Sequence, residues 1–215
     1  MSKFSTTPIT KEQLEQINVE NDELFTKIGM TRNERFFCAG RPVVIFKDIT
    51  SDSDEIDLDI FTGRIAIKNG GILSTGINPF PCGPARLTIV KWGDDEDQCG
   101  YIDCSSTLNG GPAIISLKRV TIGKNVLFGP DVTITDSDEP IDEKLSPEEM
   151  AEKIAPVTIE DHAWLGLGAT VLKGVTIGHH AVVSANAVVY RDVPPYATAF
   201  GNPAWIVPGN PSGEK

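Results

Sequence analysis

The chain has 215 residues, of which 40% are hydrophobic and 7% aromatic, and its formal net charge is −11. A chain of this length buries one sizeable core, which favours one main domain with an appendage over two equal domains. The charge excludes nucleic acid and anionic membranes as principal partners, because both would be repelled, and it leaves small molecules and other proteins.

The N-terminal sequence shows no sign of export. Residues 1–16, MSKFSTTPITKEQLEQ, lack the apolar segment of a signal peptide. No run of the chain approaches the roughly 18 apolar residues that span a membrane. The four cysteines form no C-x-x-C pair, which with this start predicts reduced, structural thiols at Cys38, Cys82, Cys99 and Cys104. We therefore expect a cytoplasmic protein without membrane insertion.

The first predicted element is an amphipathic helix over residues 10–29, where apolar residues recur at helical spacing and a glycine can end the helix: Leu14, Ile17, Leu24, Ile28 and Gly29. Residues 30–101 contain short apolar stretches, such as PVVIF and ARLTIVKW, between glycine and proline clusters. These stretches predict strands in irregular coils. We expect residues 1–55 to cover the open edge of the structure that follows, and residues 207–215 to form a polar tail.

From residue 102 onward, aliphatic side chains recur every six positions. In the C-terminal third this row consists of Ile159, Leu165, Val171, Ile177, Val183 and Val189. A second row of small or branched residues stands two positions earlier, at Val157, Ala163, Ala169, Val175, Ala181 and Ala187. Upstream the pattern continues through Ile102, Leu108, Ile114, Val120, Ile122, Val126, Phe128, Val132 and Ile134. Two inward positions with one residue between them are typical of a short strand.

Strands this short, without hairpin signals between them, predict that the chain coils. Each hexad then supplies one strand and one corner, and successive coils stack identical positions into buried ladders. Ordinary sheet strands with an even spacing are the alternative, but the two interlocking rows favour the solenoid. We expect the solenoid to occupy residues 56–206.

The six-residue rhythm breaks at residues 136–156, DSDEPIDEKLSPEEMAEKIAP. Between positions 136 and 153, eight acidic and two basic residues give a net charge of −6, a pattern that usually faces solvent. The segment SPEEMAEK predicts a short helix with Ser146 as N-cap and Glu149 completing a capping box. We expect this segment to leave the coil as a loop.

The stretch IEDHAWLGLGATVLKGVTIGHHAVVSANAVVYRDVPPYATAFGNPAWIV (159–207), preceded by VTIGKNVLFGPDVTIT (120–135), resembles the hexapeptide-repeat acyltransferases, which include galactoside, maltose and polysaccharide O-acetyltransferases. The resemblance is specific over residues 112–207. It implies an all-β fold, namely a left-handed parallel β-helix with an N-terminal helix and a protruding loop. It also implies a homotrimer with acyl-CoA in grooves between neighbouring subunits, and a loop that covers the acceptor site.

The resemblance places the CoA groove at Trp164, Leu167, Ala185, Tyr190 and Arg191, although the family commonly has Thr and Lys at the last two positions. Trp205 follows GNPA where the family has a basic residue, and an indole there can stack on adenine. Lys173 lies one full coil, or three hexads, before Arg191. Stacked cations need an anion beside them, for which a CoA phosphate is the candidate. Two hydrated surface charges are the alternative.

The catalytic end departs from the family pattern. In these enzymes a histidine just before the loop acts as general base on the acceptor hydroxyl, whereas here Glu139 stands before the proline in DSDEP. A carboxylate serves as base if its pKa is raised, and the neighbouring Asp138 would raise it. We therefore predict Glu139 as the base with Asp138 beside it. The alternative is a solvated acidic segment without catalytic function.

The three histidines suggest a metal site only weakly. His162 and His180 occupy equivalent positions three hexads apart and should stack at one corner, whereas His179 should point to the other side. A catalytic zinc site needs three protein ligands. Because a third ligand is missing, we expect exposed corner histidines and no metal.

These features together predict a CoA-dependent acyltransferase with acetyl-CoA as donor and no metal, which acylates a hydroxyl or amine of a sugar or other small molecule. The alternative is a catalytically inactive family member that serves as a trimeric ligand-binding or assembly module. The missing histidine supports this alternative, and the retained motifs AWLG, VTIG, YRDVPP and GNPA oppose it. A trimer that binds a nucleotide-sugar without transfer is a third reading.

Overall fold

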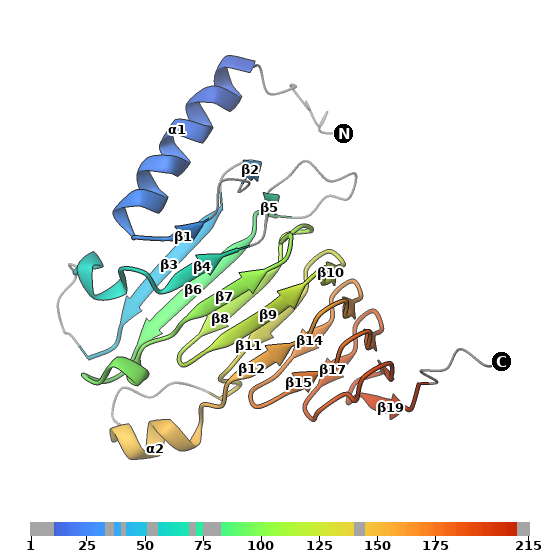
Figure 1. The fold of residues 1–215 in the computed structure, drawn as a ribbon. Helices are drawn as coiled ribbons and strands as arrows, with labels where there is room; N and C mark the ends of the chain where they lie inside the picture. Colours follow the sequence, from blue (N-terminus) through green and yellow to red (C-terminus); the bar gives the residue numbers. More distant parts are fainter. Residues whose placement is uncertain are drawn as a thin grey trace, which may run out of the picture.

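The computed structural model describes residues 11–32, 37–39, 42–50, 56–68, 72–74, 83–139 and 145–209. Most of its regular structure is β, and the strands stack from the N-terminal helix α1 (Lys11–Lys27) at one end towards β19 (Trp205–Val207) at the other (Figure 1). Cys82 and the side chains of Leu14 and Cys38 lie outside the described part.

Three sheets contain strands from successive passes of the chain. In spatial order the first contains β1 (Thr31–Arg32), β4 (Ile65–Ile67), β7 (Ile102–Ser105), β9 (Val120–Lys124), β12 (Val157–Ile159) and β15 (Thr176–Ile177). The second contains β10 (Leu127–Phe128), β13 (Trp164–Leu165), β16 (Val182–Val183), β18 (Thr198–Phe200) and β19. The third contains β17 (Val188–Val189), β14 (Thr170–Val171), β11 (Thr133–Thr135), β8 (Ala113–Ser116), β6 (Arg86–Lys91) and β3 (Val43–Asp48). A separate parallel pair joins β2 (Phe37–Ala39) to β5 (Ile72–Ser74).

The chain visits these sheets in a fixed order. Strands β12, β13 and β14 lie in the first, second and third sheets, and β15, β16 and β17 repeat that order. Neighbouring strands of these two coils are parallel, and their register advances by three hexads: Thr158 pairs with Thr176, Trp164 with Val182, and Thr170 with Val188. The six-residue period of the sequence is therefore one side of a three-sided coil.

The sharp corners use residues with a left-handed backbone. At the corner between the first and second sheets these residues are Asn125, His162, His180 and Tyr196, with φ between 56° and 62°. At the next corner they are Asp131, Gly168 and Asn186. A left-handed conformation costs most residues roughly 1–2 kcal/mol, and asparagine, aspartate and glycine tolerate it best. The cost at the histidines and the tyrosine is offset by the strands that each corner joins.

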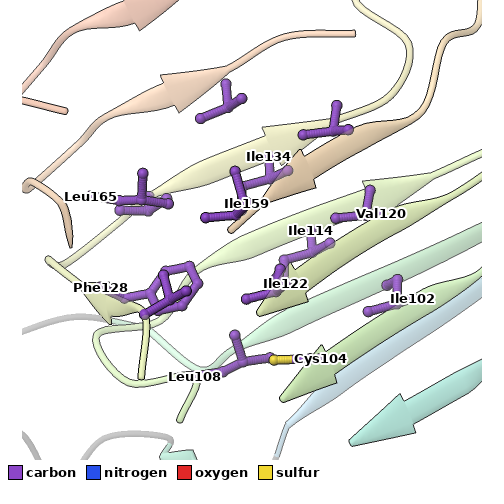
Figure 2. Packing of buried hydrophobic residues seen from close by; sticks show 14 of the residues in the cluster. Ile102, Cys104, Leu108, Ile114, Val120, Ile122, Phe128, Ile134, Ile159 and Leu165 are labelled. Atoms are coloured by element: carbon purple, nitrogen blue, oxygen red, sulfur yellow. The ribbon is translucent and has the colours of Figure 1, made fainter. Parts of the chain in front are cut away.

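The interior consists of the two predicted ladders. Every residue of both rows is buried, and Ala163, Ala169, Ala181 and Ala187 are 0% exposed. Figure 2 shows side chains such as Ile114, Val120 and Ile159 pointing from different sheets into one shared core. Each buried Val or Ile contributes about 1.5–3 kcal/mol before conformational entropy is subtracted. The prediction of stacked aliphatic ladders is confirmed.

The N-terminal part joins the same stack. The predicted helix is confirmed as α1, and its buried Phe25 and the adjoining Ile28 pack into the main core. Strands β1 and β3 extend the first and third sheets upstream of residue 56, where we expected the coils to begin. Two short 3-10 helices, Leu58–Phe61 and Glu96–Gln98, connect strands in this part of the chain.

Cys99 and Cys104 are free and buried, as expected for structural thiols. Burial raises the pKa of Cys104 to about 12, which leaves it protonated and unreactive at neutral pH. Neither helix in the described part of the chain combines the length and apolar character that a membrane crossing requires.

The loop leaves the coil where the hexads break. Thr133 of β11 pairs with Thr170 of β14, whereas Thr170 pairs in turn with Val188, so the turn that contains the excursion is about twice as long as the next one. Residues 140–144 lie outside the described part, but the helix α2 (Pro147–Glu152) is present with the predicted capping box between Ser146 and Glu149. The buried Met150 packs α2 against Trp92 in a small second cluster. The described residues between Thr135 and Val157 therefore interrupt the succession of ladder strands.

Candidate functional site

The excursion begins with two carboxylates held by two lysines. Lys173, which follows β14, donates to Glu139 Oε1 at 2.7 Å, and its Nζ lies 3.4 Å from Asp138 Oδ1. Lys153, which follows α2, donates to Glu139 Oε2 at 2.5 Å. Glu139 thus ties both ends of the excursion to one corner of the coil. Sequence reasoning missed Lys153, because only the fold brings residue 153 back to residue 139.

These contacts decide the protonation state of Glu139. Hydrogen bonds from Lys153 and then Lys173, together with their positive charges, lower the pKa of Glu139 to about 2. In turn the hydrogen bond to Glu139 raises the pKa of Lys173. The raised pKa that we expected for Glu139 is therefore wrong, because the hydrogen bonds and charges of the two lysines dominate its surroundings. A carboxylate with a pKa near 2 is a weak base, and its assignment as the catalytic base stays a prediction.

A third carboxylate stands three positions earlier and is buried. Asp136 is 0% exposed, and its oxygens accept hydrogen bonds from the Ser116 hydroxyl at 2.8 Å and from the backbone N–H groups of Leu117, Lys118 and Arg119 at 2.7–2.8 Å. Burial raises the pKa of Asp136, while these hydrogen bonds act in the opposite direction. Asp136 therefore fixes the turn between β8 and β9. Its place directly after a ladder strand was the only signal in the sequence.

The residues predicted to bind CoA fall into two groups. Trp164 and Trp205 lie on the second sheet, 53% and 67% exposed, and Leu167 and Ala185 are exposed at its corner with the third sheet. The second group, Lys173, Tyr190 and Arg191, follows strands of the third sheet at the opposite edge. A single chain therefore does not bring all seven predicted residues into one groove.

The cations of the second group already have neighbours within the chain. The anions beside Lys173 are Glu139 and Asp138. The Arg191 Cζ atom lies 5.5 Å from the ring centroid of Tyr190, which is half-exposed. The two cations that lie one coil apart are thus accommodated without a bound phosphate, and Arg191 keeps its guanidinium available at the surface.

The histidines stack as the spacing predicts. The rings of His162 and His180 lie 4.8 Å apart with an interplanar angle of 4°, and Tyr196 continues the column at 5.1 Å. His179 Nδ1 lies 3.1 Å from Glu160 Oε2. Within the described ranges, no three His, Cys, Asp or Glu side chains are grouped so that they could hold a metal ion. The column is an exposed feature of one corner.

Comparison with known proteins decides the nature of the repeat. Residues 156–191 match the family described as the hexapeptide repeat of succinyl-transferase. These residues therefore carry a hexapeptide repeat. It is 38% identical over 87 residues to the galactoside O-acetyltransferase of Lactococcus lactis, covering 40% of this chain and 42% of that protein. It is 35% identical over 94 residues to the galactoside O-acetyltransferase of Escherichia coli, covering 44% and 46%.

The match spans about half the length of the curated relatives or less. Among solved structures, the chain is similar to a hexapeptide-repeat acetyltransferase of Vibrio cholerae complexed with acetyl coenzyme A, with 22% identity, a TM-score of 0.48, and coverage of 89% of this chain and 77% of that one. It is also similar to a galactoside acetyltransferase in complex with coenzyme A, with 18% identity, a TM-score of 0.44, and coverage of 94% and 84%. The predicted resemblance to hexapeptide-repeat acyltransferases is confirmed.

Proposed function

We propose that this protein is a CoA-dependent acyltransferase that transfers an acetyl group from acetyl-CoA to a hydroxyl or amine of a sugar or other small molecule. The observation that carries the proposal is the similarity of the chain to two galactoside O-acetyltransferases over 87 and 94 residues. The family match over residues 156–191, which includes the AWLG motif, supports it. Thioester attack needs no metal. Oriented N–H donors in a groove would stabilise the tetrahedral oxyanion.

The architecture that supports this function is a left-handed parallel β-helix whose sheets include β1 and β3, upstream of residue 56, and extend to β19. In this arrangement the helix α1 covers its N-terminal end. The two groups of predicted cofactor residues support a homotrimer, because a groove between neighbouring subunits would join Trp164 of one subunit to Arg191 of the next. The exposed indole and the available guanidinium suit an adenine ring and a phosphate, respectively.

For Glu139 to act as the base, it must lose its hydrogen bonds to Lys153 and Lys173. In the described conformation its pKa of about 2 opposes proton abstraction. When the acceptor displaces Lys153 and Lys173, the pKa of Glu139 returns towards the ordinary range, and the adjacent Asp138 raises it further. Glu139 then takes the proton of the acceptor hydroxyl, the acceptor oxygen bonds to the thioester carbonyl carbon, and the CoA thiolate leaves.

A second candidate function is an inactive, trimeric ligand-binding or assembly module. It is favoured by one observation, the ion pairs that hold Glu139 as a weak base. The sequence places no histidine in the excursion that could replace Glu139, since its three histidines are His162, His179 and His180.

Isothermal titration with acetyl-CoA and with CoA tests the proposal. We expect dissociation constants near micromolar, about −8 kcal/mol. Binding of acetyl-CoA followed by transfer to a hydroxyl or amine acceptor supports the enzyme. Absence of binding for both donors would contradict the proposed activity and favour the module.

A further inference from the structure

A pocket of about 450 Å³ lies at the corner where the third sheet leads into the first, beside the excursion. Three cationic residues line it: Arg64, Lys118 and Arg119. Tyr101 and Pro156 complete the wall, and the exposed Glu96 and Asp97 also contribute. Three cations in one pocket contrast with the net charge of −11 for the whole chain.

The cationic turn of this pocket is built by the buried Asp136. Its carboxylate accepts hydrogen bonds from the backbone N–H groups of Lys118 and Arg119, both at 2.8 Å. On the far side, Val157 donates its N–H to the carbonyl of Arg119 at 3.0 Å. The turn is therefore held from both ends of the excursion, and its two side chains project from a fixed backbone.

The guanidinium groups are also positioned. The Arg119 Cζ atom lies 4.6 Å from the centroid of the Tyr101 ring, and Arg64 Nη1 donates to the backbone carbonyl of Glu96 at 3.1 Å. Within the described residues, no carboxylate lies within 4.0 Å of the cationic groups of Arg64, Lys118 or Arg119. These three cations therefore form no ion pair with a described residue, although Glu96 and Asp97 line the same pocket.

We propose that this pocket binds an oxyanion, a carboxylate or a phosphate, carried by the acceptor molecule. The planar fork of an arginine matches either group with two parallel hydrogen bonds, and a lysine adds a point charge. The assignment to the acceptor rests on the proposed acyltransferase function. It is supported by distance along the chain, because Glu139 stands three positions after Asp136, a stretch that spans at most about 11 Å. The acceptor class is then an acidic sugar or a sugar phosphate.

The test titrates the full chain at low ionic strength with inorganic phosphate, with glucuronate, and with neutral galactose as the uncharged comparison. We expect phosphate and glucuronate to bind, and galactose to bind at least about tenfold more weakly, since the charge supplies the affinity. Lys118→Gln combined with Arg119→Gln should weaken both anions by at least about tenfold. Equal binding of galactose and glucuronate, or unchanged anion binding by the double variant, would overturn the proposal.

The matched control is Lys124→Gln, which removes an exposed lysine at the end of β9, the strand that follows Lys118 and Arg119, and which lies outside the pocket. We expect it to change anion binding by less than about twofold. Thermal unfolding of both variants checks that the fold is kept. Arg119→Lys keeps the positive charge but loses the planar guanidinium. We therefore expect its affinity for phosphate and glucuronate to lie between those of wild type and the double variant.

Titration with acetyl-CoA distinguishes an anionic group of the acceptor from a phosphate of CoA. We expect the double variant to bind acetyl-CoA as wild type does. A loss of at least about tenfold in acetyl-CoA affinity would assign the pocket to a CoA phosphate and overturn the acceptor assignment. If wild type binds glucuronate but not acetyl-CoA, the proposed acyltransferase function fails while the oxyanion pocket stands.

Discussion

The coils downstream of residue 157 and the excursion at residues 136–156 are built on opposite principles. In the coils, both inward positions of every hexad are apolar and fully buried, and identical positions stack on one another from coil to coil. Around the excursion the buried group is the carboxylate of Asp136, which four hydrogen-bond donors surround. The repeated hexads therefore supply the apolar core, and polar side chains gather where the hexads are interrupted.

Removal of the buried carboxylate of Asp136 should have the largest effect on stability. Asp136→Ala removes the acceptor of three backbone N–H groups, those of Leu117, Lys118 and Arg119, and one of the two acceptors of the Ser116 hydroxyl, which also lies against the carbonyl of Tyr101. Each buried group that is left unsatisfied costs about 1–3 kcal/mol. We expect a loss of about 4 kcal/mol in the free energy of unfolding, measured by denaturant titration. Asp136→Asn keeps one carbonyl oxygen and should lose less. Equal stability of Asp136→Ala and wild type would refute the anchoring role.

Truncation of the apolar ladder should have the next largest effect. Ile177→Ala opens a cavity between coils that pack at 0% exposure, and we expect it to cost about 3 kcal/mol. The matched control is Val207→Ala on the terminal strand, where the side chain is 50% exposed and a change within about 0.5 kcal/mol is expected. A similar loss in both variants would contradict the ladder as the source of stability.

Glu139→Gln tests the catalytic reading of the excursion. The variant keeps the size of the side chain and removes its basicity, and we expect turnover with acetyl-CoA to fall about 100-fold if Glu139 is the base. Lys124→Gln serves as a charge-changing control that leaves the excursion intact. Turnover of Glu139→Gln at the wild-type rate would remove Glu139 from the mechanism.

Trp164→Ala tests the exposed apolar face of the second sheet. We expect the dissociation constant for acetyl-CoA to rise about tenfold, because Trp164 presents one of the two exposed indoles that are predicted to contact the donor. Leu127 is the register partner of Trp164 one coil earlier and is 62% exposed, so Leu127→Ala is the matched control on the same face. A larger effect in Leu127→Ala would place the donor elsewhere.

The smallest expected effect is a pH dependence of stability. The pKa of Glu139 is lowered from 4.5 to about 2 in the folded chain, so its ion pairs stabilise the fold above pH 4.5, and this contribution is lost as the pH falls through about 2. We expect the difference in Tm between wild type and Glu139→Gln to be constant above about pH 5 and to shrink towards about pH 2. A difference that does not change over this range would contradict the depressed pKa.

Much of the fold could be predicted from the sequence. The positions of the ladder from Ile102 to Val189, the stacking of His162 on His180, the helix α1, and the capped helix α2 with Ser146 and Glu149 are all confirmed. Each of these features depends on the local spacing of residues or on the period that every coil repeats, so the sequence pattern alone is enough to predict it. The N-terminal strands β1 and β3 were harder to place, because they join the sheets without following the six-residue period.

The candidate site could be predicted only in part. The sequence singled out Glu139 and Lys173, but the pairing of Glu139 with both Lys173 and Lys153 depends on the path of the loop between them. The prediction of a raised pKa for Glu139 failed for this reason, since Asp138 is its neighbour in the sequence, whereas the contacts of Glu139 with the two lysines exist only in the fold. In the same way, the convergence of Arg64 with Lys118 and Arg119 joins residues that lie far apart in the chain.

The stacked coil follows from the six-residue pattern alone, because burial of that pattern brings every inward side chain against the equivalent side chain one coil away. The arrangement of charged groups around residues 136–156 depends on the folded chain, which buries Asp136, pairs Glu139 with two lysines and leaves Arg64, Lys118 and Arg119 without an ion pair among the described residues. Electrostatic and hydrogen-bond energies depend on distances of a few ångströms between groups far apart in the chain. Those distances are set by how the excursion folds back onto the corner.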